Sequence, residues 1–125
     1  MDQLIDDYNE TDQSCYFDFS PQGDFSSIES TISIAVYRFL QEAISNVIKH
    51  AQSDLALITL SLHSAPHELT IRVQDHGKGF DITKKTSSLG LISMRERMSS
   101  LGGNFSIESE QGKGTTIFAR IPLKN

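Results

Sequence analysis

Residues 69–80 read LTIRVQDHGKGF. Apolar and polar side chains alternate through the first half of this stretch, which predicts a β-strand with one buried face. Leu69, Ile71 and Val73 share that face, and Asp75 falls in phase with them. A carboxylate on a buried strand face costs free energy unless something pairs with it. Asp75 is therefore a candidate hydrogen-bond acceptor for a ligand.

Two glycines, Gly77 and Gly79, follow Asp75 closely. Glycine permits positive φ and lets a ligand approach the backbone. We interpret the stretch as a pocket floor, where a fixed acceptor is followed by bare backbone for a flat or phosphorylated ligand. The alternative is a strand that ends in an ordinary turn containing Asp and Gly, and the rest of the chain has to distinguish the two.

The composition is that of one soluble globular domain. The chain has 125 residues, of which 38% are hydrophobic and 22% charged, which suits a single core. Its net charge of −5 argues against a nucleic-acid surface. With Cys15 as the one cysteine, an internal disulfide is impossible and a reducing, cytoplasmic compartment fits. The sequence contains no apolar run of membrane-spanning length, so we expect no direct membrane contact by this part.

The first segment, residues 1–13, is acidic and resembles the tail of a preceding helix or a linker, and any packing partner is expected outside the chain. Residues 14–125 form the predicted domain. Within it, residues 15–19 alternate and predict a strand with the cysteine and both phenylalanines inward, and residues 21–24 predict a turn.

From about Ser30 to Ala51 the apolar period changes to that of a helix. Asn46 and His50 fall on the border of its apolar stripe, where a polar group can face a partly desolvated cleft. Asn has low helix propensity, which makes Asn46 a stronger candidate than its neighbours. Polar residues opposite the stripe, such as Glu42 and Lys49, could equally be a solvated surface. The predicted stripe consists of Tyr37, Leu40, Ala43, Ile44, Val47, Ile48 and Ala51.

Two hairpins and a second helix complete the predicted elements. Residues 55–62 and 69–75 form a hairpin with a longer loop, and residues 105–109 pair with 115–122. Residues 80–89 are polar and could form a lid, with Lys84 and Lys85 facing phosphates or only solvent. The following helix, 91–101, begins after Gly90, so its free N–H groups could receive an anion.

Common nucleotide motifs are absent from the sequence. The P-loop pattern fails because Gly114 follows Lys113, and the dinucleotide fingerprint fails at Ile82. Four other blocks occur in order, namely QEAISNVIKHA at 41–51, DHGKGF at 75–80, GLISMRER at 90–97 and GKGTT at 112–116.

This ordered set resembles the ATP-binding domain of sensor histidine kinases in the GHKL superfamily, and more narrowly the nitrate- and degradation-sensor subfamily. The resemblance covers about residues 14–123. It implies an α/β (α+β) two-layer sandwich of the Bergerat type, with a mixed sheet and helices packed on one face. One departure is Ser88, where the family usually has glycine, and it bears on the closed geometry of the lid.

The resemblance also implies ATP and Mg²⁺ as cofactors. Asn46 would hold Mg²⁺ through its amide oxygen, with Glu42 orienting the metal shell as the second catalytic residue. Asp75 would accept the adenine amino group, and the N–H groups of Gly90 and Leu91 would lie near the phosphates. The full predicted cofactor-binding set is Asn46, Lys49, His50, Asp75, Gly77, Gly79, Phe80, Gly90, Leu91, Met94, Gly114 and Thr115.

The resemblance implies that the chain binds ATP but does not phosphorylate itself, because His50, His63, His67 and His76 do not lie in a phosphoacceptor helix. The expected partners are a dimerisation domain that carries the acceptor histidine, in a homodimeric parent, and a response regulator with a LuxR-type output domain. Alternatives are an ATPase of the gyrase or mismatch-repair type, an anti-sigma-type serine kinase, or a degenerate docking module without enzymatic activity.

Overall fold

The computed structural model describes residues 2–11, 15–26, 28–51, 53–77 and 90–123. These residues form a five-stranded sheet with the strand order β1-β2-β3-β5-β4. Strands β1 and β2 are parallel, and the other neighbouring pairs are antiparallel. The strands are β1 (Tyr16–Gln22), β2 (Leu55–Ser64), β3 (His67–Asp75), β4 (Asn104–Glu110) and β5 (Gly114–Pro122).

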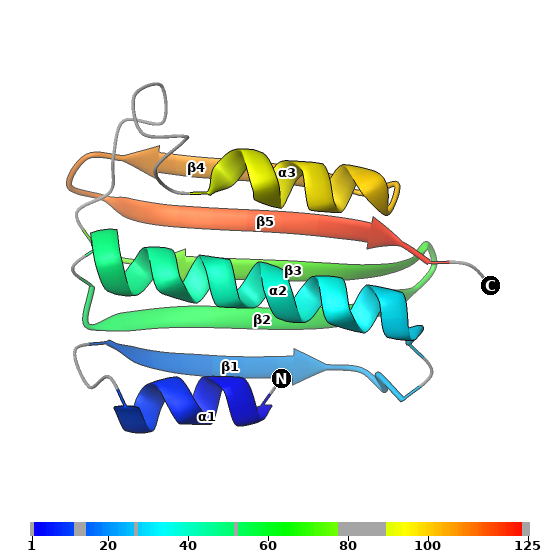
Figure 1. The fold of residues 1–125 in the computed structure, drawn as a ribbon, viewed down its shortest axis with the longest axis horizontal. Coiled ribbons are helices and arrows are strands. Elements are labelled where there is room, and N and C mark those ends of the chain that lie inside the picture. Colours follow the sequence, from blue (N-terminus) through cyan, green and yellow to red (C-terminus); the bar gives the residue numbers. More distant parts are fainter. Residues whose placement is uncertain (1, 12–14, 27, 52, 78–89, 124–125) are drawn as a thin grey trace.

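The helices pack on one face of this sheet (Figure 1). Helix α2 (Ser30–Asn46) lies over β2 and β3, and it continues as a π-helical turn, η1 (Val47–Ala51). Helix α3 (Leu91–Ser100) lies over β4 and β5, and α1 (Asp2–Thr11) lies beside β1. The two-layer α/β sandwich with a mixed sheet, predicted from the sequence, is confirmed.

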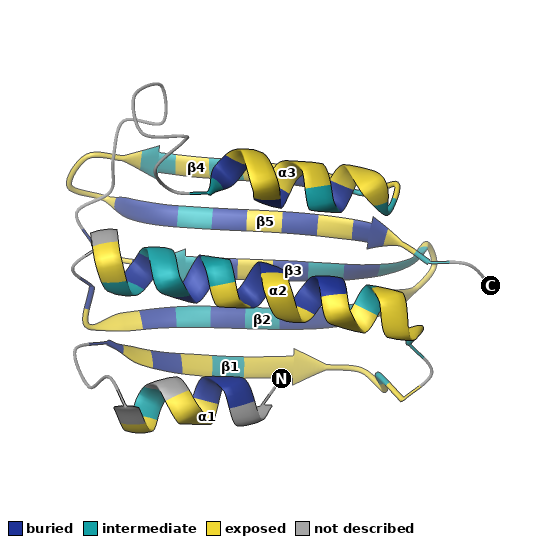
Figure 2. Cartoon of the chain, viewed as in Figure 1, coloured by how far each residue is buried: buried dark blue, intermediate teal, exposed yellow. Residues whose placement is uncertain are grey.

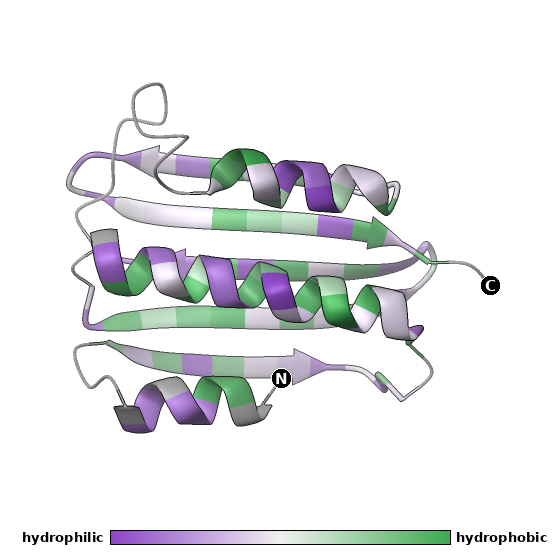
Figure 3. Ribbon diagram, viewed as in Figure 1, coloured by the Kyte–Doolittle hydropathy of each residue, from purple (hydrophilic) through white to green (hydrophobic). Residues whose placement is uncertain are grey.

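Buried side chains from both layers form one hydrophobic core, and buried bands alternate with less buried ones along the strands (Figure 2). Figure 3 shows the matching alternation of hydrophobic and hydrophilic residues. Phe39, Leu40 and Ile44 of α2 are fully buried against Ile58 and Ile71 of the sheet layer. Among the described residues, no helix is long and apolar enough to cross a membrane.

Helix α1 corrects one expectation, because its apolar side chains pack within the chain. Leu4 and Ile5 are buried and belong to the common core. The side-chain amide of Asn9 also accepts a hydrogen bond from the N–H of Phe17 at 2.8 Å and donates one to its carbonyl at 3.0 Å. This amide therefore takes the place of a neighbouring strand at the outer edge of β1. The boundary at residue 14 stays a prediction.

Three further details differ from the expectations. Tyr37, placed in the buried stripe of α2, is 40% exposed, because the stripe is centred on Val36, Leu40 and Ile44 instead. The β2–β3 hairpin has a tight turn at Ala65 and Pro66 rather than a longer loop. Strand β1 continues through Pro21. Proline has no backbone N–H to donate, and an edge strand tolerates this because one of its sides has no partner strand.

Glycines end helix α3 as predicted. The N–H of Gly103 donates to the carbonyl of Met98 at 2.8 Å, and the N–H of Gly102 donates to Ser99 at 3.0 Å. Gly102 has φ +75°, so this pair of bonds is a Schellman cap that needs a left-handed residue. The cap turns the chain directly into β4.

Candidate functional site

The predicted site residues that the structure describes gather at one end of the sandwich, where β3 ends and β5 begins (left in Figure 1). Asp75 ends β3 and pairs in register with Ala56 on one side and Thr115 on the other. The C-terminal end of α2 and the N-terminal end of α3 lie at this same end. Strands and helices therefore bring together blocks that are far apart in the sequence.

Asp75 lies inward, as its phase in the strand predicted. It is 5% exposed, and its Oδ1 accepts a hydrogen bond from the N–H of Gly77 at 2.9 Å. Burial raises the pKa of Asp75 above its usual value, and this effect outweighs the opposing hydrogen bonds from the backbones of Gly77 and Thr115 and the influence of His76. The carboxylate is therefore a fixed acceptor in a desolvated position.

Two of the residues near Asp75, Ala56 and Gly114, have little or no side chain. Ala56 is fully buried on β2, and Gly114 is buried on β5. Gly114 has φ +90°, and a Cβ there would overlap the backbone carbonyl of Asp75. This close contact with the backbone of Asp75 explains why glycine is required at position 114.

The sequence analysis predicted Thr115 but missed the hydroxyl groups of Ser53 and Ser109 at this end of the sheet. Ser53 is 7% exposed, and its hydroxyl donates to the carbonyl of Leu55 at 2.6 Å and accepts from the N–H of His76 at 3.3 Å. It thereby holds the backbone just after Asp75. On the other side, the hydroxyls of Ser109 and Thr115 lie 2.8 Å apart. A serine just before a strand could have suggested the first of these, since Ser favours such local turns.

The C-terminal part of α2 faces the start of α3. Glu42 and Asn46 are both half-buried and stand one helical turn apart on α2. The Glu42 side chain lies against Gly90, where an added Cβ would overlap its carboxylate. Lys49 is exposed, and His50 is placed by its backbone within η1.

The start of α3 supplies the remaining predicted residues. Gly90 precedes the helix with φ +67°, and its carbonyl accepts the first helical hydrogen bond, from the N–H of Met94 at 3.1 Å. Leu91 and Met94 are buried in the core, with Met94 fully so. These two side chains therefore anchor α3 in the core. The polar backbone groups at the N-terminal end of α3 are its N–H groups.

Two predicted residues, Gly79 and Phe80, lie outside the described residues. So does the proposed lid, residues 80–89, with its two lysines and Ser88. Within the described residues, the site consists of a floor, formed by Asp75, Gly77 and Thr115, and a helical side, formed by α2 and α3.

Comparison with known proteins identifies related sequences. The family model for histidine kinase-, DNA gyrase B- and HSP90-like ATPases matches residues 31–125. The histidine-protein kinase/phosphatase DegS of Bacillus subtilis is 38% identical over 94 residues, covering 72% of this chain and 24% of DegS. The sensor histidine kinase LiaS of B. subtilis is 36% identical over 99 residues, covering 78% of this chain and 27% of LiaS. The chain spans about a quarter of the length of these curated relatives.

Solved structures share the fold. The blue-light activated histidine kinase of Erythrobacter litoralis matches with a TM-score of 0.74 at 21% identity, over 98% of this chain and 40% of that one. The histidine kinase AdeS of Acinetobacter baumannii matches with a TM-score of 0.75 at 13% identity, over 99% of this chain and 63% of that one.

Proposed function

The chain belongs to the family of histidine kinase-, DNA gyrase B- and HSP90-like ATPases, and we propose that it is the ATP-binding catalytic domain of a two-component sensor histidine kinase. In this role it holds Mg-ATP for phosphoryl transfer to a histidine in a separate dimerisation domain of a homodimeric, cytoplasmically acting parent. A response regulator, with a LuxR-type output domain, then receives the phosphoryl group. The similarity to DegS and LiaS supports this choice within the family.

The observation that carries the proposal is the buried carboxylate of Asp75 at the end of β3. A neutral base edge that donates an N–H to a desolvated carboxylate forms a charge-assisted hydrogen bond of about 1.5–3 kcal/mol. The adenine amino group is such a donor. The register partner of Asp75 on β2 is Ala56, which carries only a methyl group, and the backbone at Gly77 is already held by Asp75.

The helical side offers oxygen ligands of the kind that Mg²⁺ prefers. The Asn46 amide and the Glu42 carboxylate stand one turn apart on α2, and Mg²⁺ takes few protein ligands and keeps several waters. These residues fit the ion, with Asn46 as its ligand and Glu42 orienting its waters. When bound, Mg²⁺ supplies neutralisation of the phosphate charges, which is a large part of catalysis in phosphoryl transfer.

The N-terminus of α3 would receive the phosphates. Its free N–H groups and the positive end of the helix dipole favour an anion, and Gly90 brings the backbone close to Glu42. The Glu42 carboxylate would repel a phosphate bound at the start of α3. A cation between the carboxylate and the phosphate would remove this repulsion. Lys49 is exposed near the end of α2 and is available for a further contact.

Isothermal titration of Mg-ATP into this chain tests the proposal. We expect saturable binding, and we expect Asp75→Asn to weaken it at least about tenfold, which corresponds to about 1.4 kcal/mol. The matched control is Asp18→Asn, which removes an exposed carboxylate from β1 and should leave the affinity unchanged.

Absence of binding heat, or equal affinities for the wild type and Asp75→Asn, would contradict ATP binding at this end of the sheet. The kinase assignment is tested separately by ATP turnover. Steady hydrolysis by this chain alone would favour the hydrolytic members of the family, because a kinase domain without its acceptor histidine should show little turnover.

A further inference from the structure

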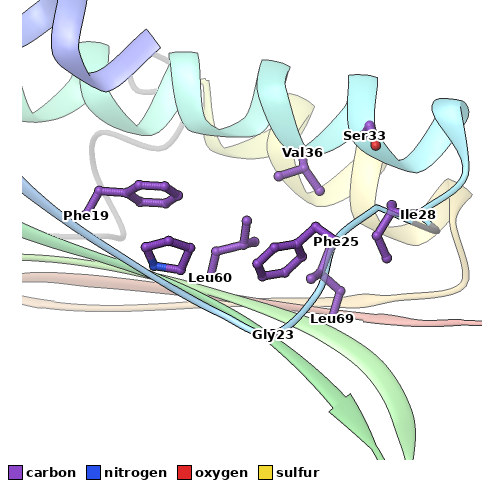
Figure 4. A pocket seen from close by; sticks show the side chains of 9 residues that line it. Phe19, Gly23, Phe25, Ile28, Ser33, Val36, Leu60 and Leu69 are labelled. Atoms are coloured by element: carbon purple, nitrogen blue, oxygen red, sulfur yellow. The ribbon is translucent and has the colours of Figure 1, made fainter. Parts of the chain in front are cut away.

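A second concave site lies near the N-terminal end of α2, where β1 leaves the sheet (Figure 4). It has a volume of about 370 Å³. Its lining comes from the end of β1, the segment that leads to α2, the first turns of α2, and the facing parts of β2 and β3. The lining residues are Phe19, Pro21, Gly23, Phe25, Ile28, Ser33, Val36, Leu60 and Leu69.

The base of this cavity is part of the hydrophobic core. Val36, Leu60 and Leu69 are each less than 5% exposed. Phe25 and Ile28, which are only partly buried, form walls around them, and Figure 4 shows the Phe25 ring beside Leu60 and below Val36. The cavity therefore has a buried apolar base and apolar walls.

The backbone at Gly23 fixes one rim of the cavity. Gly23 has φ +120°, and a Cβ there would come 2.8 Å from the Cβ of Leu62. The chain thus passes tightly against β2 and then continues to α2 through Phe25 and Ile28. This close passage sets the course of the segment along the mouth of the cavity.

From these features we propose that the cavity binds a small, neutral, apolar molecule of one or two rings. All of its lining side chains are uncharged, and the Ser33 hydroxyl is their one polar group. A charged ligand would lose its hydration without a compensating partner. Ligand pockets typically measure about 300–1,000 Å³, and an apolar cavity of about 150 Å³ holds benzene, so this cavity has room for a bicyclic ring.

The cavity is separate from the proposed nucleotide site. Ser33 lies near the start of α2 and Asn46 at its end, and the helical rise of about 1.5 Å per residue places them about 20 Å apart. The inference therefore does not depend on ATP binding, and it can be tested without nucleotide.

Indole is the probe for the test, followed by its effect on ¹³C-methyl NMR signals of the whole chain. We expect saturable shifts at the methyl groups of Ile28, Val36, Leu60 and Leu69, with Ile117 as an unaffected reference. Ser33→Phe should weaken indole binding at least about tenfold, because the new ring fills the mouth of the cavity. A tenfold loss of affinity corresponds to about 1.4 kcal/mol of binding free energy. Indole-3-carboxylate should bind at least tenfold more weakly than indole, because its carboxylate would lose hydration in the cavity without gaining a charged or hydrogen-bonding partner.

The matched control is Thr31→Phe, which adds the same ring to an exposed position of the same helix outside the cavity lining. It should bind indole like the wild type. Phe25→Ala is a second variant, which removes a wall and should also weaken binding. Shifts that do not saturate, shifts of equal size at Ile117, or wild-type affinity in Ser33→Phe with a wild-type spectrum would each overturn the proposal.

Discussion

At the scale of single residues, Asp75 is a carboxylate that the fold keeps in an unfavourable place. It is buried, and its pKa is raised mainly by desolvation. The backbone hydrogen bonds from Gly77 and Thr115 reduce this effect without cancelling it. Such a group lowers stability when it is ionised, so its presence is best explained by what it binds. Perturbed carboxyl groups of this kind concentrate at functional sites.

The raised pKa has a defined consequence for stability. Because the folded-state pKa lies above the unfolded one, the wild type should lose stability as the pH rises from below the ordinary value of 3.8 through the folded-state pKa. Asp75→Asn has no ionisable group at this position, so its stability should not fall for this reason. Urea unfolding at a series of pH values should therefore show the wild type losing stability relative to Asp75→Asn across that window. An identical pH dependence of the two proteins would contradict the raised pKa.

The same titration affects the proposed ligand. Protonation removes the negative charge that strengthens the hydrogen bond to adenine, so the affinity for Mg-ATP should fall as the pH drops through the raised pKa of Asp75. We expect this decline to begin at a higher pH than an exposed aspartate would produce. Calorimetry across the pH range, with the nucleotide's own protonation measured separately, checks the expectation.

At the scale of elements, the β4–β5 hairpin contains two glycines with positive φ, of which Gly112 has open space around its Cα and Gly114 is closely packed. Gly112 has φ +84° and nothing within 4 Å of an added Cβ, whereas Gly114 has φ +90° and is packed against the backbone of Asp75. The backbone conformation at Gly114 is therefore coupled by direct contact to the position of Asp75. Gly114 matters because a backbone atom cannot move aside as a side chain can.

These two glycines form a matched pair for mutation. Gly112→Ala should cost about 1 kcal/mol of unfolding free energy, from the left-handed backbone alone. Gly114→Ala should cost roughly 1–3 kcal/mol more, because overpacking adds to that strain, and it should also weaken Mg-ATP binding. Urea unfolding and calorimetry measure both effects. Equal losses in the two variants would show that the contact with Asp75 is unimportant.

Helix α1 is attached to the sheet through Asn9, which makes both of its amide hydrogen bonds to the backbone of Phe17. Asn9→Ala leaves these two half-buried backbone groups without their partner, so we expect a loss of about 1–3 kcal/mol in unfolding free energy. Glu10→Ala, at an exposed neighbouring position, is the control and should change little. A stable Asn9→Ala protein would mean that Leu4 and Ile5 hold the helix alone.

The predictions at this scale succeeded where a local pattern determines the structure. Alternation along 69–75 placed Asp75 inward, and the glycines after Leu101 ended α3. Tyr37 was misplaced because a helical stripe read from one helix leaves its rotation uncertain, and the sheet beneath settles it on Val36 and Leu40. The packing of α1 and the contact of Glu42 with Gly90 are tertiary contacts, which no local pattern contains.

At the scale of the whole molecule, the proposed nucleotide site joins both layers of the sandwich. The proposed acceptor, Asp75, is on the sheet, and the proposed metal ligand and phosphate site are on α2 and α3. A ligand held by both layers should stabilise the entire domain, because it binds the folded state alone. The linkage gives about 2.7 kcal/mol when the free ligand is at 100 times its Kd.

Thermal unfolding with Mg-ATP tests this expectation. At saturation, the midpoint of the wild type should rise by roughly 10 °C, given a shift of about 4 °C per kcal/mol for a domain of this size. Asp75→Asn should show a smaller rise at the same nucleotide concentration. A midpoint that does not respond to Mg-ATP would contradict binding to the folded domain.

The placement of α2 and α3 on one face leaves the opposite face of the sheet as a practical attachment surface. Ser106 of β4 is exposed and pairs with the exposed Phe118, while the native Cys15 is only 2% exposed. A thiol introduced as Ser106→Cys should therefore react selectively with maleimide reagents. Tethered to a sensor chip through that thiol, the domain would present its helical layer to the solution.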